Sequence, residues 1–475
     1  MSSELFGKPS PADAAPLRDL SRSQMQEILR QTEQYVLGFL DRLPFEPADA
    51  TADGRRLAAE AATPRWPDQG EEFTRLLKVI AEKVVPPSYS TAGGGYLAYI
   101  PGGGLFPSAV ADLIADITNR YMAVATPAPA AVRIELDVLN WFGQMVGYPD
   151  TVAGTLTSGG SIANLTALIC GRVDRLGEFF QDGMIYTSTQ AHHSVERAAR
   201  HAGFRPAQVV SLPVDDRFRI DLAALERQTS ADRQKGRRPA LIVANAGATN
   251  TGAVDPLEEL AAMARREGLW LHVDAAYGGF FLLTERGRQA MKGIELSDSV
   301  TLDPHKGLFL PYGTGSILVR DGRLLKEAMG ARADYLQDLD LGEGQVNFHE
   351  ISLEMSRDFR GLRVWLPLRM FGRDAFRATL DEKLDMTWWL YERLRKLDGL
   401  HFLEEPQLSI LAFTARDDEA SRRLMRTINA SQKVLLSSTM IDGRYVIRVC
   451  ILNFRTDWER IEQLAAIIEG AVGRL

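Results

Sequence analysis

Short apolar runs rich in β-branched residues alternate with longer amphipathic segments between about residues 96 and 330. This alternation is typical of strands that lie parallel in a sheet and are joined by covering helices. The clearest predicted strands are 184–186, 240–244, 269–273, 299–302 and 315–319, and the clearest helical patterns between them are 191–201 and 256–267. We therefore expect an α/β fold.

The flanking segments follow different patterns. In residues 25–43, apolar side chains recur at helical spacing, which predicts a helix in an N-terminal arm. After about residue 360, a long helical stretch (361–397) precedes predicted strands at 409–413 and 445–451, and a final helix begins at Trp458. We expect three parts: a helical arm (1–95), a large α/β domain (96–360) and a smaller α+β domain (361–475).

Composition narrows the class of protein. The chain has 475 residues, of which 45% are hydrophobic and 25% charged, so it can bury a sizeable core. Lys and Arg total 55 against 62 for Asp and Glu, a net charge of −7, which leaves no overall basic field for nucleic acid or anionic lipid. Cys170 and Cys450 lie far apart, as suits a reducing compartment. With no leader or membrane span visible, we expect a cytoplasmic protein.

A lysine follows one of the predicted strands. The strand ends at Asp303, because Pro304 cannot donate to a central ladder, and His305 and Lys306 are then expected in the next loop. Ligands of open α/β sheets bind at such strand ends. Taken alone, however, a lysine in this position is more often a solvated surface charge.

A carboxylate ends another apolar strand. Asp274 is followed by Ala275 and Ala276, and a buried ionised carboxylate is costly without a cationic or hydrogen-bonding partner. Asp274 could simply cap the next turn. It could also pair with a protonated ring nitrogen, since the two alanines would let a flat ring approach the backbone.

A third segment, 154–168, runs from a short strand through small residues into a helix. Gly160 and Ser161 would present backbone N–H groups at the positive end of that helix, a suitable cradle for a phosphate. A plain glycine-rich turn is equally consistent. There is no Walker-type lysine and no G-x-G-x-x-G register, which argues against nucleotide and nicotinamide enzymes.

The histidines give little sign of a metal site. The seven include no H-E-x-x-H motif, and adjacent His192 and His193 on a helix would point about 100° apart, so we expect no metal. His192 is either a surface residue or an imidazole stacked on a cofactor ring.

Together these segments resemble the group II pyridoxal-phosphate decarboxylases, which include aromatic-L-amino-acid and glutamate decarboxylases. The likeness runs from about residue 96 to the last helix. It implies the aspartate-aminotransferase-like fold (fold type I), with a mainly parallel seven-stranded sheet, and pyridoxal 5'-phosphate as cofactor. By this resemblance Lys306 forms the internal aldimine, Asp274 pairs with the pyridine nitrogen and His192 stacks on the ring. The implied cofactor-lining set also includes Gly160, Ser161, Thr249, Ala276 and His305.

The resemblance also implies a reaction, the decarboxylation of an L-amino acid, with aromatic ones favoured, to the amine and carbon dioxide. Tyr335 matches the tyrosine of the family's mobile loop, here about 331–345, and would protonate Cα as a general acid. Because both this tyrosine and the stacking histidine are present, we expect an amine rather than an aldehyde product. The family's substrate-pocket stretch corresponds to Tyr99, Ile100, Pro101 and Gly102.

Some positions depart from the family's pattern. Gly307 stands where aromatic amino acid decarboxylases usually have Trp, and Ile100 stands where an aromatic residue is often found. Asp303 replaces the Asn of some members. Because a carboxylate would repel the phosphate dianion, Asp303 is left out of the predicted cofactor-binding set.

Two alternative functions stay open. The chain could be an aminotransferase or another fold type I lyase, with Arg448 holding the substrate carboxylate, although Arg448 could equally form an ion pair that packs the domains. It could also be a catalytically inactive homodimeric binding protein. The resemblance implies a homodimer with active sites at the subunit interface, and a small-molecule substrate as the other partner.

Overall fold

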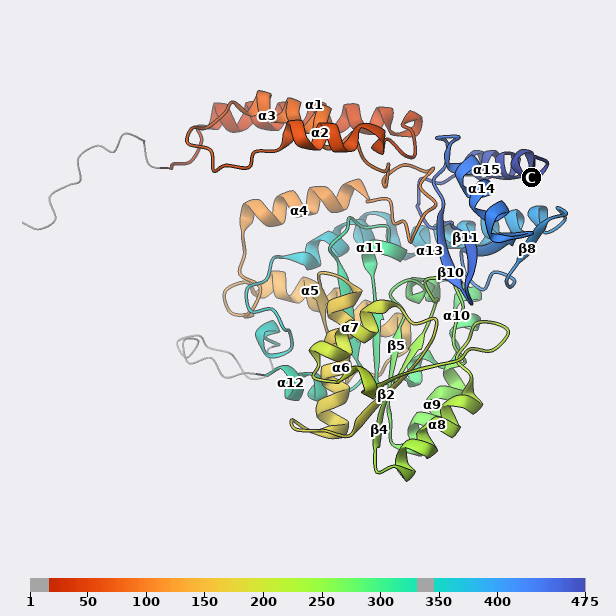
Figure 1. The fold of residues 1–475 in the computed structure, drawn as a ribbon. Helices are drawn as coiled ribbons and strands as arrows, with labels where there is room; N and C mark the ends of the chain where they lie inside the picture. Colours follow the sequence, from red (N-terminus) through yellow and green to blue (C-terminus); the bar gives the residue numbers. More distant parts are fainter. Residues whose placement is uncertain (1–16, 331–345, 475) are drawn as a thin grey trace, which may run out of the picture. The chain divides into compact units, whose positions relative to one another are not determined.

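The computed structural model describes residues 17–330 and 346–474. The chain divides into two compact units, one formed by Met1–Glu46 and Ala50–Tyr89, the other by Pro47–Asp49 and Ser90–Leu475 (Figure 1). The first unit holds the helices α1 (Arg22–Arg42), α2 (Gly54–Ala61) and α3 (Phe73–Val79). The helix expected over 25–43 is confirmed, and it begins earlier because Ser21 caps α1 by accepting a hydrogen bond from the amide of Gln24.

The second unit is built on a seven-stranded sheet with the strand order β1-β7-β6-β5-β4-β2-β3. β7 is antiparallel to both of its neighbours, and the other pairs are parallel. The mainly parallel seven-stranded sheet is thereby confirmed. Its strands are β1 (Ala153–Thr157), β2 (Gly183–Ser188), β3 (Val209–Leu212), β4 (Arg238–Asn245), β5 (Trp270–Asp274), β6 (Ser299–Leu302) and β7 (Gly315–Val319).

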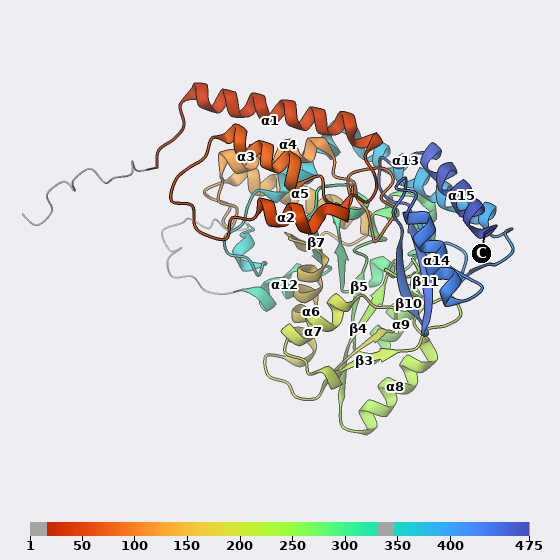
Figure 2. The same ribbon diagram turned by 45° about the horizontal axis from the view of Figure 1, so that its top comes forward.

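Helices cover this sheet, as the alternating pattern predicts. Those that contact its strands are α5 (Pro129–Val146), α6 (Gly160–Leu176), α8 (Leu222–Gln234), α9 (Leu257–Glu267) and α12 (Gly322–Met329). The same unit also contains α4 (Phe106–Thr118), α7 (His193–His201) and α10 (Glu285–Ala290). α6 contacts β4, β5, β6 and β7, and it lies beside α7 (Figure 2). Strands β2, β5, β6 and β7 are buried along their whole length, which explains their continuous apolar character.

A second, antiparallel sheet has the order β10-β11-β9-β8. Its strands are β8 (Leu400–Phe402), β9 (Ile410–Ala415), β10 (Ser437–Ile441) and β11 (Arg444–Cys450), and its helices are α14 (Asp418–Asn429) and α15 (Trp458–Val472). α13 (Arg360–Leu394) contacts α4 and α5 beside the large sheet, and it also contacts α15 and β9 of the second sheet and its helices. The helix is interrupted at Gly372, where φ is 74°. The division of the chain at residues 95 and 360 stays a prediction.

One local expectation is wrong. His305 and Lys306 do not lie in a loop but in α11 (Pro304–Gly307), a single helical turn directly after β6. Proline suits the first position of a helix because the amide hydrogen it lacks would have no partner there. Pro304 therefore ends the strand, as expected, and also begins the turn that carries the lysine.

Within the described ranges, no helix is both long enough and apolar enough to span a lipid bilayer.

Candidate active site

A cavity of about 270 Å³ lies at the carboxyl ends of β4, β5 and β6, beside the start of α6. This is where open α/β sheets bind ligands. Eight of the predicted residues line it, namely Gly160, Ser161, His192, Thr249, Asp274, Ala276, His305 and Lys306. Segments separated by up to about 150 positions in the sequence therefore meet around one space.

The start of α6 forms a cradle on one wall of the cavity. A Cβ atom at Gly160 would lie 3.2 Å from Cβ of Ala276 and 2.9 Å from Oδ2 of Asp303, so a side chain there would close the space. The first amides of this 17-residue helix have no helical acceptor and carry the positive end of the helix dipole. These features suit a phosphate group.

Asp274, the last residue of β5, presents a fixed carboxylate. Asn164 donates a hydrogen bond of 2.8 Å from Nδ2 to Oδ2, and the amide of Ala276 donates one of 3.1 Å to Oδ1. Both carboxylate oxygens are thus held in place by hydrogen bonds. Asp274 is only 8% exposed and lines the cavity, so its carboxylate can contact a group that binds there.

Behind Asp274 lies a buried chain of hydrogen bonds. Nε1 of Trp270 donates to Oγ of Ser299 (2.9 Å), and Ser299 Oγ lies 2.9 Å from Nδ1 of His272. His272 Nε2 lies 3.1 Å from Oδ1 of Asn164. Burial lowers the pKa of His272 to about 4, so the ring is neutral at pH 7. Because Nδ2 of Asn164 donates to Asp274, Oδ1 of Asn164 accepts from Nε2–H of His272, and Nδ1 of the neutral ring then accepts from the Ser299 hydroxyl.

His192 caps the N-terminus of α7. Its Nδ1 accepts from the amide of Ser194 at 3.2 Å and lies 2.8 Å from Oγ of the same serine. Burial lowers the pKa of His192, although the nearby Asp274 carboxylate opposes this effect. The ring is therefore neutral at pH 7, with its proton on Nε2.

Lys306 lies beside a second carboxylate. Its Nζ is 3.0 Å from Oδ2 of Asp303, which is 2% exposed. Burial alone would lower the pKa of Lys306, but the carboxylates of Asp303 and Asp274 outweigh it and raise the pKa. His305 donates from Nδ1 to the carbonyl of Thr314 (2.5 Å), and burial lowers its pKa despite the nearby Asp303.

The predicted substrate stretch does not line this cavity. Gly102 packs against the backbone of α11, the turn that carries Lys306: a Cβ atom at Gly102 would lie 2.1 Å from the carbonyl oxygen of His305. Ile100 is buried, whereas Tyr99 is 56% exposed with φ at 54°. Pro101 is also buried. Tyr335 lies outside the described residues.

Arg448 lies 3% exposed on β11. Its Nε donates to the carbonyl of Asn250 (3.0 Å), NH1 donates to Oγ of Ser437 (2.9 Å), and NH2 donates to the carbonyl of Thr249. Each guanidinium nitrogen thus has an acceptor within the protein, and these acceptors are two carbonyls and a hydroxyl rather than a carboxylate. Arg448 fixes the backbone beside Thr249, which corrects the expectation of an ion pair.

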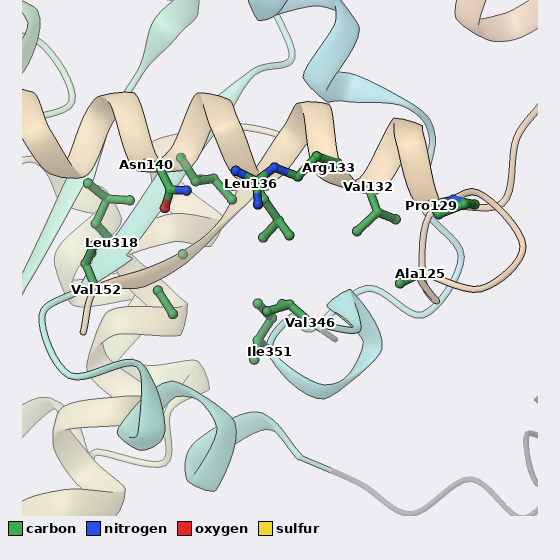
Figure 3. A pocket seen from close by; sticks show the side chains of 13 residues that line it. Ala125, Pro129, Val132, Arg133, Leu136, Asn140, Val152, Leu318, Val346 and Ile351 are labelled. Carbon is green, nitrogen blue, oxygen red and sulfur yellow. The ribbon is translucent and has the colours of Figure 1, made fainter. Parts of the chain in front are cut away.

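A separate cavity of about 400 Å³ lies between α5 and the β1/β7 edge of the sheet (Figure 3). Val132, Leu136 and Leu318 give it mostly apolar walls, and Arg133 and Asn140 are its polar side chains. None of the predicted site residues lines it. In the described ranges, no group of three or more His, Cys, Asp or Glu side chains is placed to hold a metal ion.

Several residues of the site were not singled out from the sequence. Asn164 and Ser194 lie within the glycine-rich and histidine segments but carried no signal of their own. His272 sits two positions before Asp274, on the same face of β5, which is the one local hint of its role. Asp303 was excluded, yet its carboxylate forms part of the cavity wall.

The site fits pyridoxal phosphate. An amine for the aldehyde, a carboxylate for the ring nitrogen, an imidazole for the ring face and a helix start for the phosphate surround one cavity. The fold and this set of side chains together define a pyridoxal-phosphate-dependent enzyme. Sequence comparison gives the narrower class: residues 58–416 match the pyridoxal-dependent decarboxylase conserved domain, and the chain belongs to that family of amino acid decarboxylases.

Known proteins resemble the chain over most of its length. It is 34% identical to an aromatic-L-amino-acid decarboxylase of Bacillus atrophaeus, over 94% of this chain and 95% of the relative. It is 32% identical to an L-2,4-diaminobutyrate decarboxylase of Rhizobium meliloti (strain 1021), over 74% and 72%. A crystal structure of Oryza sativa TDC with PLP and tryptamine shares the fold, with a TM-score of 0.91, 24% identity, and coverage of 97% of this chain and 99% of that one.

Proposed function

We propose that this pyridoxal-phosphate-dependent decarboxylase converts aromatic L-amino acids to the corresponding amines and carbon dioxide. The observation that carries the chemistry is the meeting of Lys306, Asp274 and His192 around one cavity at the start of α6. The preference for aromatic substrates rests on the likeness to the Bacillus atrophaeus enzyme over nearly the whole chain.

The bound cofactor supplies a conjugated ring that accepts the electron pair left when the substrate carboxylate departs. In the proposal, Lys306 holds the cofactor covalently and Asp274 keeps the ring nitrogen protonated. His192 lies against the ring, and the amides that begin α6 bind the phosphate with Gly160 and Ser161. Tyr335 delivers the proton to Cα, so that the product is an amine.

Two other assignments are less well supported. An aminotransferase commonly needs an arginine free to hold the substrate α-carboxylate, and the guanidinium nitrogens of Arg448 already donate to protein oxygens. The likeness to a diaminobutyrate decarboxylase makes a basic amino acid the competing substrate. A screen of amino acids for carbon dioxide release distinguishes aromatic from basic substrates.

We also propose that the protein is a homodimer in the cytoplasm. Leu113, Ile114 and Ile117 on α4 are 49%, 47% and 71% exposed, and a cluster of exposed apolar side chains of this kind marks an interface. A second copy of the chain is the proposed partner, and Cys170 and Cys450, both free and buried, suit a reducing compartment. Light scattering that finds a fully active monomer would contradict the dimer.

The test of the function is a screen of the common L-amino acids for carbon dioxide release, with the product identified as amine or aldehyde. Aromatic amino acids should be turned over fastest. Borohydride reduction of the enzyme with its cofactor, followed by peptide mapping, should place the label on Lys306. Lys306→Ala should abolish both signals, whereas Lys292→Ala, at an exposed position, should retain them. Turnover of basic amino acids alone would overturn the substrate assignment.

A further inference from the structure

We propose that Asp303 is the proton partner of Lys306: its carboxylate stabilises the protonated amine and accepts the proton when the amine becomes a nucleophile. Asp303 thereby sets the pH at which Lys306 reacts. The inference rests on the proposed role of Lys306 as the covalent anchor. It adds to the site a residue that was left out of the predicted cofactor-binding set.

The contact between the two side chains is direct. Nζ of Lys306 lies 3.0 Å from Oδ2 of Asp303, a hydrogen-bonded ion pair within one helical turn. Among the described residues, Asp303 is the acidic side chain that forms an ion pair with Lys306. The carboxylate is 2% exposed, so water screens this charge pair little.

The position of the carboxylate is fixed by its surroundings. A Cβ atom at Gly160 would lie 2.9 Å from Oδ2, and one at Gly315 would lie 2.7 Å from Oδ1. Two glycines therefore form the slot that holds Asp303. Its Oδ1 is buried and has no hydrogen-bond partner, so this carboxylate can accept a proton without breaking another hydrogen bond.

Other groups near Lys306 come from several elements. They are Asp274 at the end of β5, His192 at the start of α7, Cys450 on β11, and His305 and Tyr312 beside the lysine turn. Both oxygens of Asp274 already accept hydrogen bonds. Burial keeps the two imidazoles neutral and raises the pKa of the Cys450 thiol to about 12, so neither the imidazoles nor the thiol carries a charge at pH 7. Asp303 is therefore the best-placed acceptor.

The step balances without another reactant. One N–H bond of the Lys306 ammonium breaks, an O–H bond forms on Oδ2 of Asp303, and the pair changes from two opposite charges to two neutral groups. The neutral amine would then have the free lone pair that a covalent bond to the cofactor's aldehyde requires. An asparagine at position 303 could accept a hydrogen bond from the ammonium but could not take its proton.

The experiment measures the pH at which Lys306 becomes reactive. Full-length protein freed of cofactor is pulsed with an acetylating reagent between pH 6 and 11, and each lysine is followed by peptide mass spectrometry. In the wild-type protein, the midpoint for Lys306 should lie at or above that of exposed Lys396. In Asp303→Asn the midpoint should fall by about one pH unit or more, so that labelling at pH 8 becomes about tenfold faster.

Asp321→Asn is the matched control. Asp321 lies beyond the far end of β7, where it caps α12 through the amide of Arg323, and asparagine can also cap. This variant should leave the Lys306 midpoint unchanged, and Lys396 should behave alike in all three proteins. If Asp303→Asn fails to fold, a wild-type midpoint below that of Lys396 would still overturn the proposal, because a buried lysine with a proton partner should not titrate below an exposed one.

Two failures can be told apart. If pyridoxal phosphate and borohydride label Lys306 but its midpoint is unchanged in Asp303→Asn, or already lies below that of Lys396, the role of Asp303 is overturned and the proposed function stands. If the reduced cofactor is found on another residue, the proposed function itself is wrong.

Discussion

The side-chain amide of Asn164 holds the carboxylate of Asp274 through a hydrogen bond of 2.8 Å. The same Nδ2 lies 3.1 Å from Oγ of Ser194, which contacts the ring of His192, while Oδ1 faces His272. Asn164 therefore connects the proposed partner of the ring nitrogen with the proposed stacking imidazole. Because both ends of its amide are engaged, the group cannot rotate without losing hydrogen bonds.

We expect Asn164→Ala to impair the reaction rather than the fold. The variant removes a hydrogen bond to a buried carboxylate, a loss of about 1.5–3 kcal/mol, or roughly 10- to 150-fold in kcat/KM. Steady-state kinetics and cofactor titration measure the effect. Asn140→Ala, at an exposed position of α5, should stay within twofold of wild type, and equal activity of the two variants would show that Asn164 does not position Asp274.

The neutral state of His272 should make stability depend on pH. Burial lowers the pKa of His272 to about 4 from an ordinary 6.5, so between these values the unfolded chain binds a proton that the folded one does not. The contribution of His272 to the free energy of unfolding therefore has its full value above pH 6.5. It decreases by about 3 kcal/mol as the pH falls towards 4 and the unfolded chain takes up this proton.

The measurement is the thermal denaturation midpoint across pH 4–7. His272→Gln removes the titrating group, so its midpoint should fall less than that of the wild-type protein over this range. Other buried acids such as Asp255 titrate in both proteins and cancel in the comparison. His201→Asn, at an exposed position, should follow the wild-type curve. Parallel curves for wild type and His272→Gln would mean that His272 is not held neutral.

Gly102→Ala should damage both the fold near Lys306 and cofactor retention. The added methyl group would lie 2.1 Å from the carbonyl oxygen of His305, so the backbone of one segment must move. We expect a thermal midpoint several degrees lower and weaker binding of pyridoxal phosphate, followed by absorbance. Gly470→Ala, inside α15 and with no neighbouring atom within 4 Å of the new group, should keep or raise the midpoint. An unchanged Gly102→Ala protein would refute the close approach.

A buried ion pair holds α5 to the chain before α13. Oε1 of Glu135 lies 2.5 Å from NH2 of Arg357, and both side chains are fully buried. Glu135→Gln leaves the buried arginine with only the longer contact to Glu354, whose Oε2 lies 4.0 Å from Nε, so the change should cost about 3 kcal/mol and lower the thermal midpoint. Joint replacement by Glu135→Leu and Arg357→Met should recover most of the loss. Removal of the exposed pair Arg56–Glu60 should leave the midpoint unchanged, and a similar effect at both pairs would contradict this account.

The sequence predicts what is encoded locally. Apolar runs marked the strands of the large sheet, and small residues before a helical pattern marked the start of α6. The lysine after β6 was predictable because Pro304 limits the strand. The same proline concealed α11, since a proline that ends a strand and one that begins a helical turn look alike in a sequence.

Contacts between distant segments could not be predicted in this way. Asn164 and His272 are 108 positions apart, and Glu135 and Arg357 are 222 apart, so nothing in their neighbourhoods indicates that they meet. Asp303 illustrates a different difficulty. Considering only the phosphate suggests repulsion, whereas the amine 3.0 Å away gives the carboxylate a partner of opposite charge.

The close approach of Gly102 to the carbonyl of His305 matters to anyone who would redesign the enzyme. The segment 99–102, which carries Tyr99 and Ile100, packs through Gly102 against the turn of Lys306. In a mutant library that randomises all four positions, most variants would have a side chain at position 102 and should bind the cofactor poorly. A substitution at Ile100, with position 102 kept as glycine, would leave this close approach to the turn of Lys306 intact.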